Sequence, residues 1–230
     1  DFNGGISSAR TITIVIDGVN DNPVATSDTQ TTNESSNIIN EPFPVTDIDT
    51  DNGSGINTYN NIDYNNFDFT YNSEFGFITD NEDGTYTFNQ NGDFENLTAG
   101  TVHQVSFDFT ATDLDGASSE LETVTINIIG INDNPVAYND TVSTDEDTSY
   151  NGDVPDATDI DSDNIGDGSD NYNNVNPNGY SLYSQSGITG GELTFNSNGT
   201  YSFDPDDDFE YLADGASENV SFQYRASDLN

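Results

Sequence analysis

Residues 19–25 read Val19-Asn20-Asp21-Asn22-Pro23-Val24-Ala25, and nearly the same residues return 112 positions later as Ile131-Asn132-Asp133-Asn134-Pro135-Val136-Ala137. The motif Thr46-Asp47-Ile48-Asp49 returns at the same distance, as Thr158-Asp159-Ile160-Asp161. A fixed period of this length indicates that the chain contains two copies of one structural unit.

Two further motifs return after 115 residues instead, Gly84-Thr85-Tyr86 as Gly199-Thr200-Tyr201 and Asp93-Phe94-Glu95 as Asp208-Phe209-Glu210. The additional residues of the second copy therefore lie in the intervening stretch, which is rich in Asn and Tyr. Because insertions are tolerated in loops, the segments 57–64 and 171–174 are predicted to form loops. Their mixture of aromatic rings and amides would also suit the binding of a sugar.

Short segments with alternating apolar and polar residues predict β-strands. The segment Arg10-Thr11-Ile12-Thr13-Ile14-Val15-Ile16 has a copy at residues 122–128, and residues 105–109 have a copy at residues 220–224. No segment shows a helical period. Units of this length with many short strands and turn residues predict an all-β fold of antiparallel sandwiches, in which Phe94 and Phe209 are expected to be core residues.

The first and last residues of the chain fall at the same phase of the repeat, since Asp1-Phe2-Asn3 and Asp228-Leu229-Asn230 both align with Asp113-Leu114-Asp115. We therefore expect residues 1–18 to be the last strand of a preceding repeat. Residues 19–131 would form the first complete repeat, and residues 132–230 a second repeat that lacks its final strand. Either the chain continues, or a strand from another copy completes this repeat by head-to-tail donation.

The composition excludes several classes of function. With 43 acidic residues and only Arg10 and Arg225 as basic residues, the net charge is −41, so we expect binding neither to nucleic acid nor to anionic membranes. No apolar run is long enough to cross a bilayer. The chain has no Cys, no Lys and a single histidine, His103, which leaves almost no means of building a nucleophile–base pair. We expect no enzyme.

The acidic residues recur at fixed places in each repeat. In an extended segment alternate side chains face the same way, so an Asp-x-Asp motif points two carboxylates at one place. Two such charges about 4 Å apart repel by roughly 4 kcal/mol at an effective dielectric near 20. Such a compact, highly charged chain is expected to fold around cations, and Ca²⁺ accepts six to eight oxygen ligands in flexible geometry.

A cation site accounts for the recurring acids better than a plain acidic surface or an EF-hand does. Scattered residues such as Asp80, Glu82 and Asp170 can simply form a solvated acidic surface. An EF-hand is a poor match, because residues 47–58 carry Gly one place late and end on Thr58 rather than Glu. Mg²⁺, which prefers a stricter octahedron, is the second choice of ion.

Four motifs occur in the order that cadherin repeats use: Val45-Thr46-Asp47-Ile48-Asp49, Gly92-Asp93-Phe94-Glu95, Ala111-Thr112-Asp113-Leu114-Asp115-Gly116 and Asn132-Asp133-Asn134-Pro135. The chain resembles tandem cadherin-like repeats, close to the VCBS-type repeats of giant bacterial, RTX-type surface adhesins. The resemblance implies Ig/cadherin-like Greek-key β-sandwiches joined end to end, with Ca²⁺ bound where two repeats meet.

The resemblance also implies which residues are the metal ligands. The complete junction would use Glu34, Asp93, Glu95, Asn132, Asp133, Asn134, Asp159, Asp161 and Asp228. The first junction is half present, with Asn20, Asp21, Asn22, Asp47, Asp49 and Asp113, while Glu146, Asp208 and Glu210 would serve a third junction. Gly18 and Gly130 stand where cadherins have an additional Asp, so one or two ions per junction are expected rather than three.

The function implied is a calcium-rigidified stalk or filament repeat of a large secreted adhesin, located outside the cell at a bacterial surface. Its partners would be the neighbouring repeats. The alternative is a calcium-dependent binding module, for polysaccharide or for homophilic adhesion between cells in a biofilm.

Overall fold

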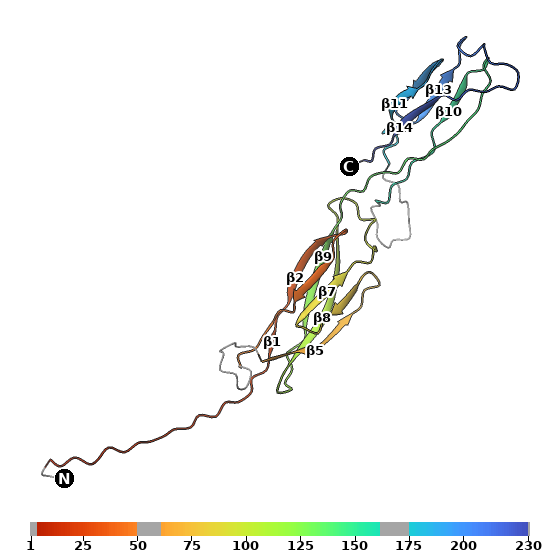
Figure 1. Cartoon of the computed structure of the whole chain (residues 1–230). Helices are drawn as coiled ribbons and strands as arrows, with labels where there is room; N and C mark the ends of the chain where they lie inside the picture. Colours follow the sequence, from red (N-terminus) through yellow and green to blue (C-terminus); the bar gives the residue numbers. More distant parts are fainter. Residues whose placement is uncertain (1–3, 50–60, 162–174, 230) are drawn as a thin grey trace.

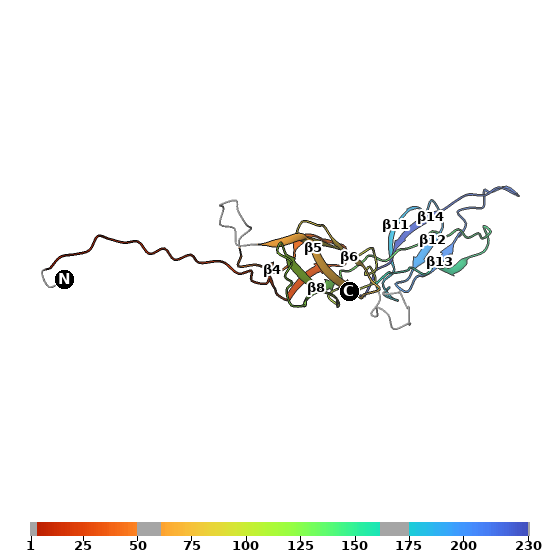
Figure 2. The same ribbon diagram turned by 90° about the horizontal axis from the view of Figure 1, so that it is seen from below.

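The computed structural model describes residues 4–49, 61–161 and 175–229. Two β-rich domains follow one another along an elongated molecule, and the N-terminal segment leads away from the first domain (Figures 1 and 2). The described part of the chain contains strands, turns and irregular segments but no helix, and accordingly none that could cross a membrane. The predicted all-β class is confirmed.

The first domain is a sandwich of two main sheets. Its strands are β1 (Val24–Ala25), β2 (Asp28–Asn33), β3 (Ile38–Pro42), β4 (Val45–Thr46), β5 (Ile62–Tyr71), β6 (Phe77–Asp80), β7 (Thr85–Asn89), β8 (Val102–Asp113) and β9 (Glu122–Ile129). One sheet has the order β2-β9-β8-β5 and the other β3-β7-β6, while β1 pairs with β4. Strand β2 runs parallel to β9, and all other neighbours are antiparallel.

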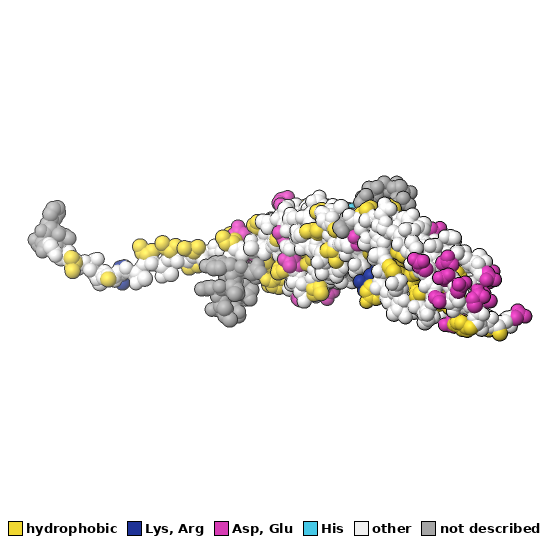
Figure 3. Space-filling view, turned by 90° about the horizontal axis from the view of Figure 1, so that it is seen from above, with side chains coloured by type: hydrophobic (Ala, Val, Ile, Leu, Met, Phe, Trp, Pro, Cys, Tyr) yellow, Lys and Arg dark blue, Asp and Glu magenta, His cyan; other side chains and the backbone are white. Residues whose placement is uncertain are grey.

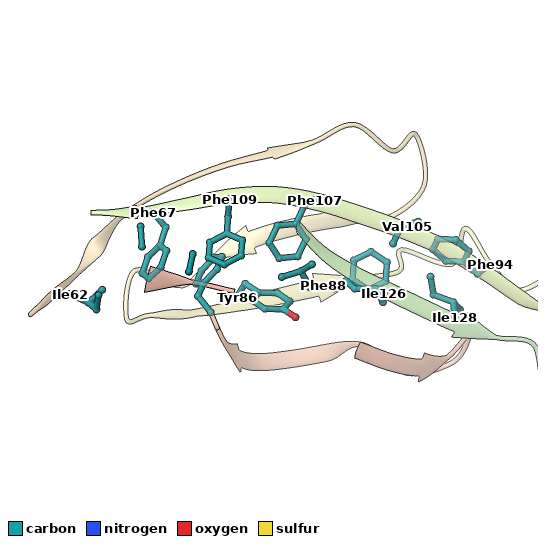
Figure 4. Close-up of a cluster of buried hydrophobic side chains, with 14 of the residues drawn as sticks. Ile62, Phe67, Tyr86, Phe88, Phe94, Val105, Phe107, Phe109, Ile126 and Ile128 are labelled. Atoms are coloured by element: carbon teal, nitrogen blue, oxygen red, sulfur yellow. The ribbon is translucent and has the colours of Figure 1, made fainter. Parts of the chain in front are cut away.

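The core of this domain lies between the two sheets, where alternate side chains of β7, β8 and β9 meet (Figure 4). Phe107 and Phe109 of β8 face inward beside Ile126 of β9, and all three are fully buried. Phe94 is also fully buried, as predicted. His103 of β8 packs on the ring of Phe94, 5.4 Å between centroids, and burial lowers its pKa.

The second domain repeats this plan with fewer strands. Its elements are β10 (Tyr150–Asp153), β11 (Ser181–Gly187), β12 (Glu192–Phe195), β13 (Thr200–Asp204) and β14 (Ser221–Arg225). Sheet β10-β13-β12 corresponds to β3-β7-β6, and the pair β11-β14 corresponds to β5-β8. The bridge Val136↔Thr158 stands where β1 pairs with β4 in the first domain. The predicted core residue Phe209 is buried.

One expectation about loops is wrong. Residues 57–64 were expected to form a loop, yet Ile62, Asp63 and Tyr64 begin strand β5. The reason is that Ile62 is buried and pairs with Asp113 at the end of β8. Residues 57–60 and the segment 171–174 lie outside the described residues.

Candidate metal centre

The linker between the two domains is held by acidic side chains from both of them. The backbone N–H of Ile131 donates to Glu34 Oε1 of the first domain at 2.6 Å. The backbone N–H of Asp133 donates to Asp161 Oδ2 of the second domain at 3.1 Å. Asn132 donates through its side-chain amide to Asp228 Oδ2 at 2.9 Å. The linker is therefore fixed at three successive residues.

Three carboxylates meet at this linker although none of them is adjacent to another in sequence. Oxygen atoms of Glu34, Asp133 and Asp161 all lie within 4.8 Å of one another. Glu34 follows β2, and Asp161 belongs to the Asp-x-Asp motif of the second domain, in which Asp159 Oδ1 accepts from the Asp161 N–H at 3.0 Å. Glu34 and Asp161 are 2% and 1% exposed, so their charges are almost completely removed from solvent.

Several oxygens of this cluster are buried and accept no hydrogen bond. Within the described residues these are Glu34 Oε2, Asp133 Oδ2, Asp159 Oδ2 and Asp161 Oδ1. A buried, unpaired carboxylate oxygen costs several kcal/mol, and charges about 4.8 Å apart repel by roughly 3–4 kcal/mol per pair at an effective dielectric near 20. A protein that folds with this arrangement requires either protons or a cation there.

The pKa values of these carboxyl groups reflect the same burial and mutual repulsion. Burial, with the charges of Asp133, Asp161 and Glu95, outweighs the hydrogen bond from Ile131 and raises the pKa of Glu34 from 4.5 to about 7. Burial also raises the pKa of Asp159 and of Asp161, and the surrounding acids, including Asp228, raise both further. Glu95 and Asp228 thus act electrostatically on the cluster.

The first linker repeats the hydrogen bonds of the second. Asn20 donates to Asp113 Oδ2 at 2.9 Å, as Asn132 does to Asp228. The Asp21 N–H donates to Asp49 Oδ2 at 2.6 Å, as Asp133 does to Asp161. The Asp49 N–H donates to Asp47 Oδ1 at 2.7 Å, and Asp47 Oδ2 is again buried without a partner. Both linkers therefore make the same hydrogen bonds to the domain that follows them.

Asp113 differs from the acids of the second linker in one respect. Burial would raise its pKa, but hydrogen bonds from Asn20, Ala117 and Asp115 outweigh that effect and lower the pKa below 3.8. This carboxylate is therefore held ionised by donors of its own domain and of the linker, and its position is fixed before any ion binds.

The predicted ligand Asp93 and its counterpart Asp208 each accept a hydrogen bond from a loop glycine. Asp93 Oδ2 accepts a hydrogen bond from the Gly76 N–H at 2.7 Å, and Asp208 Oδ2 does the same for Gly191 at 2.8 Å. In both domains the first acid of the Asp-x-Glu motif therefore closes the loop before β6 or β12, with the glycine at positive φ. Asn22 and Asn134 are exposed, and neither belongs to the cluster of three acids.

Two of the acids predicted to serve a third junction, Glu146 and Glu210, lie near each other in the second domain, and acidic side chains are crowded at the end of the molecule opposite the N-terminal segment (Figure 3). The pKa of Glu210 is raised by the charge of Asp147 and, to a smaller extent, by Glu146 and Asp207. Glu146 and Glu210 are thus close enough to interact, as Glu34 and Glu95 are in the first domain.

The structure explains why glycine replaces the cadherin-type Asp at position 130. A Cβ atom on Gly130 would lie 2.3 Å from the carbonyl oxygen of Thr98 and 2.7 Å from that of Leu97. Gly130 also donates to Thr101 O and accepts from the Gly100 N–H, both at 2.9 Å. Any side chain is excluded here. Sequence reasoning treated this glycine only as a lost ligand.

The donor set of the second linker fits a hard divalent cation. All the oxygens named above that lack hydrogen bonds belong to carboxylates, which Ca²⁺ and Mg²⁺ bind and softer metals do not prefer. Glu34, Asp133, Asp159 and Asp161 would hold such an ion, which would supply positive charge that neutralises them. No Cys is present, and the single histidine, His103, lies in β8.

Comparisons with known families divide the chain at this linker. Residues 20–130 match the bacterial cadherin-like domain family, and residues 132–230 match the bacterial Ig domain family. A cadherin-like and an Ig-like domain thus stand in tandem. Domains of these kinds are typical of extracellular surface proteins, where they act as structural or adhesion modules rather than enzymes, and cadherin-like domains generally bind Ca²⁺.

Solved structures give more distant likenesses. The chain is 18% identical to protocadherin gamma B2 extracellular cadherin domains 1–5, with a TM-score of 0.39, over 92% of this chain and 38% of that one. It is 13% identical to the D00–D0 domain of intimin, with a TM-score of 0.25, over 90% of this chain and 98% of that one. The comparison with curated proteins gives no match.

The raised pKa values predict how stability depends on pH in the absence of calcium. Because the folded state holds the Glu34 proton more tightly than the unfolded state does, the free energy of unfolding rises as pH falls from about 7 to 4.5. We expect that in EDTA the free energy of unfolding of the first domain, measured with urea, is higher at pH 5.5 than at pH 8, by up to about 2 kcal/mol.

The acids elsewhere on the chain repel one another and contribute to the same trend, so the variant Glu34→Gln is the necessary control. It should show a distinctly weaker pH dependence in this range. Equal slopes for the two proteins would mean that Glu34 is already ionised at pH 5.5. Asp113 does not disturb the comparison, because its lowered pKa acts only below pH 4.

Proposed function

We propose that this chain is a calcium-rigidified structural segment of a large bacterial surface adhesin, a stalk or filament repeat that holds other parts away from the cell. The proposal rests on the buried carboxylate oxygens at the linker that accept no hydrogen bond. They come from both domains and from the linker itself. Such a set supports a role in fixing one domain against the next.

The proposed mechanism depends on where the charges lie. Without an ion, Glu34 of the first domain and Asp161 of the second repel each other across a short linker, which favours bending or separation. With Ca²⁺ bound, the same oxygens would share one divalent cation, so bending the linker would require breaking ligand bonds. Pro135 and the hydrogen bonds of Ile131 and Asp133 restrict the linker in advance.

Extracellular calcium modules bind in the range of about 10⁻⁴–10⁻³ M. The segment would therefore be stiff outside cells and slacken when calcium is removed. The number of ions at each junction, and the assignment to the VCBS-type repeats of giant adhesins, belong to this proposal as well.

Small-angle scattering tests the mechanism. We expect the distribution of distances within the molecule to be broader, and the mean radius of gyration to be smaller, in about 5 mM EDTA than in about 5 mM CaCl₂. This calcium concentration lies above the expected dissociation constant. Magnesium at equal concentration controls for ionic strength. Superimposable profiles in calcium and EDTA would refute the mechanism.

A calcium-dependent module for polysaccharide or homophilic binding is the second prediction. It rested on loop tyrosines, but Tyr59 and Tyr172 lie outside the described residues, and the ring of Tyr64 packs against Gly84. Nothing in the described residues favours it over the stalk.

A further inference from the structure

Gln90 is a buried polar residue that lies outside the cluster of acids at the second linker. It directly follows β7 and is 2% exposed. Its side-chain amide donates to the carbonyl oxygen of Asn33 at 2.6 Å and also to that of Ser36. Both acceptors belong to the turn that follows β2 and carries Glu34. One amide group therefore holds this turn on both sides of Glu34.

Gln90 also joins this turn to the segment that carries the Asp-x-Glu motif. Its carbonyl oxygen accepts from the Asp93 N–H at 3.0 Å, and its own N–H donates to Asn37 Oδ1 at 3.0 Å. Glu34 and Glu95 belong to the two segments and lie close enough to interact electrostatically. Gln90 therefore connects the two segments of the first domain whose acids act at the second linker.

The turn after β2 does not need Gln90 in order to form. It has hydrogen bonds of its own, from the Ser36 N–H to Asn33 O at 3.2 Å and from Thr32 Oγ1 to Ser36 O at 2.7 Å. The same two hydrogen bonds occur in the second domain, within residues 144–148. There Pro205 takes the position of Gln90 and has no side-chain donor. The amide of Gln90 thus fixes where the turn lies rather than its shape.

The hydrogen bonds of Gln90 are not required to satisfy buried groups. The carbonyl oxygens of Asn33 and Ser36 would each keep a hydrogen bond from within the turn if the amide were removed. Gln90 Oε1, in contrast, is itself buried without a partner, which is a cost that an apolar side chain of similar length avoids. The contribution of Gln90 is therefore the placement of the turn rather than net stability.

We propose that Gln90 is a positioning residue of the candidate metal centre, which fixes the turn after β2 and so holds the Glu34 carboxylate at the linker before a divalent cation binds. Glu34 Oε1 accepts from the Ile131 N–H at 2.6 Å, which requires the turn and the linker to stay within reach of each other. A ligand already in place loses less freedom on binding, so the ion is held more tightly. The inference rests on the proposed calcium site and concerns what arranges one of its ligands.

Gln90→Met tests the inference, because Met has a similar length and no donor. In EDTA, amide hydrogen exchange measured by NMR should be about 10-fold faster for Ile131, whose hydrogen bond to Glu34 depends on the turn. The amides of β8 should keep their wild-type rates. Equal acceleration at Ile131 and throughout β8 would mean that Gln90 only stabilises the domain as a whole, and would overturn the inference.

Calcium titration followed by the NMR signal of Ile131 gives the dissociation constant at the second linker. We expect it to be about 10-fold higher in Gln90→Met than in the wild-type protein, as is usual when a group that orients a metal ligand is lost. The free energy of unfolding in EDTA should change little. An unchanged dissociation constant, despite faster exchange of Ile131, would show that the placement of the turn has no effect on the ion and would overturn the inference.

Gln104→Met is the matched control. It removes the same amide, which donates to Asn127 Oδ1 at 2.7 Å on the exposed face of β8, and it should change neither the exchange of Ile131 nor the dissociation constant. A wild-type protein that does not respond to calcium would refute the proposed function, and the exchange of Ile131 in EDTA would still decide whether Gln90 positions Glu34. Unchanged exchange in Gln90→Met would overturn the inference even where the wild-type protein binds calcium.

Discussion

Glu34→Gln will stabilise the calcium-free protein and remove most of the stabilisation that calcium adds. In the free protein Glu34 Oε2 is buried beside Asp133 and Asp161 without a hydrogen bond. An amide at the same place removes one of the repelling charges and can donate to a neighbouring carboxylate, while its oxygen still accepts from Ile131. We expect a gain of about 1–3 kcal/mol in the free energy of unfolding in EDTA.

The effect in calcium should have the opposite sign. A carboxylate ligand is lost from a site whose affinity depends on the number of ligand charges, so the dissociation constant should rise by about 10- to 100-fold. Saturating calcium adds about 1.4–2.7 kcal/mol when its concentration is about 10–100 times the dissociation constant. The variant should lose nearly all of this gain.

Chemical unfolding in EDTA and in calcium measures the change in the free energy of unfolding. Calorimetric titration with calcium measures the change in the dissociation constant. Glu192→Gln is the matched control, since it removes the same charge from an exposed position in β12, and it should change neither the calcium affinity nor the response to EDTA by a measurable amount. If Glu34→Gln instead destabilised the protein in EDTA and left calcium binding unchanged, Glu34 would be a purely structural acceptor for the linker.

Gly130→Ala will destabilise the first domain by about 2–3 kcal/mol, whereas Gly18→Ala at the same place in the repeat will change stability by less than about 0.5 kcal/mol. The added Cβ of residue 130 meets two backbone carbonyl oxygens, and the hydrogen bonds to Thr101 and Gly100 prevent the strand end from moving away. Around Gly18 there is no atom within 4 Å of the added carbon.

Urea unfolding of the two variants measures this difference, and calcium titration of Gly130→Ala extends it. Because Gly130 immediately precedes Ile131, whose N–H holds Glu34, displacement of residue 130 should also weaken calcium binding at the second linker. Equal stability of the two variants would show that the strand end can shift freely, and would leave the absence of the cadherin-type Asp without a steric reason.

The acids of the candidate metal centre were predictable from the sequence only in part. The recurrence of Asp47-x-Asp49 as Asp159-x-Asp161 pointed to paired carboxylates, because alternation in an extended segment depends on the local backbone alone. That Glu34 meets Asp161 depends on how two domains pack across the linker, and the sequence alone supplied this only through a family resemblance. Asp93 has a partner at Gly76, which no motif indicated.

The repeat, the alternation of Phe107 and Phe109, and the excess of acids were readable without a structure, because periodicity and charge are properties of neighbouring residues along the chain. Tertiary structure decided which positions admit a side chain at all, as at Gly130, and which acids meet at the linker. These depend on contacts between segments far apart in sequence, such as β2 with β9, whose geometry no local pattern contains.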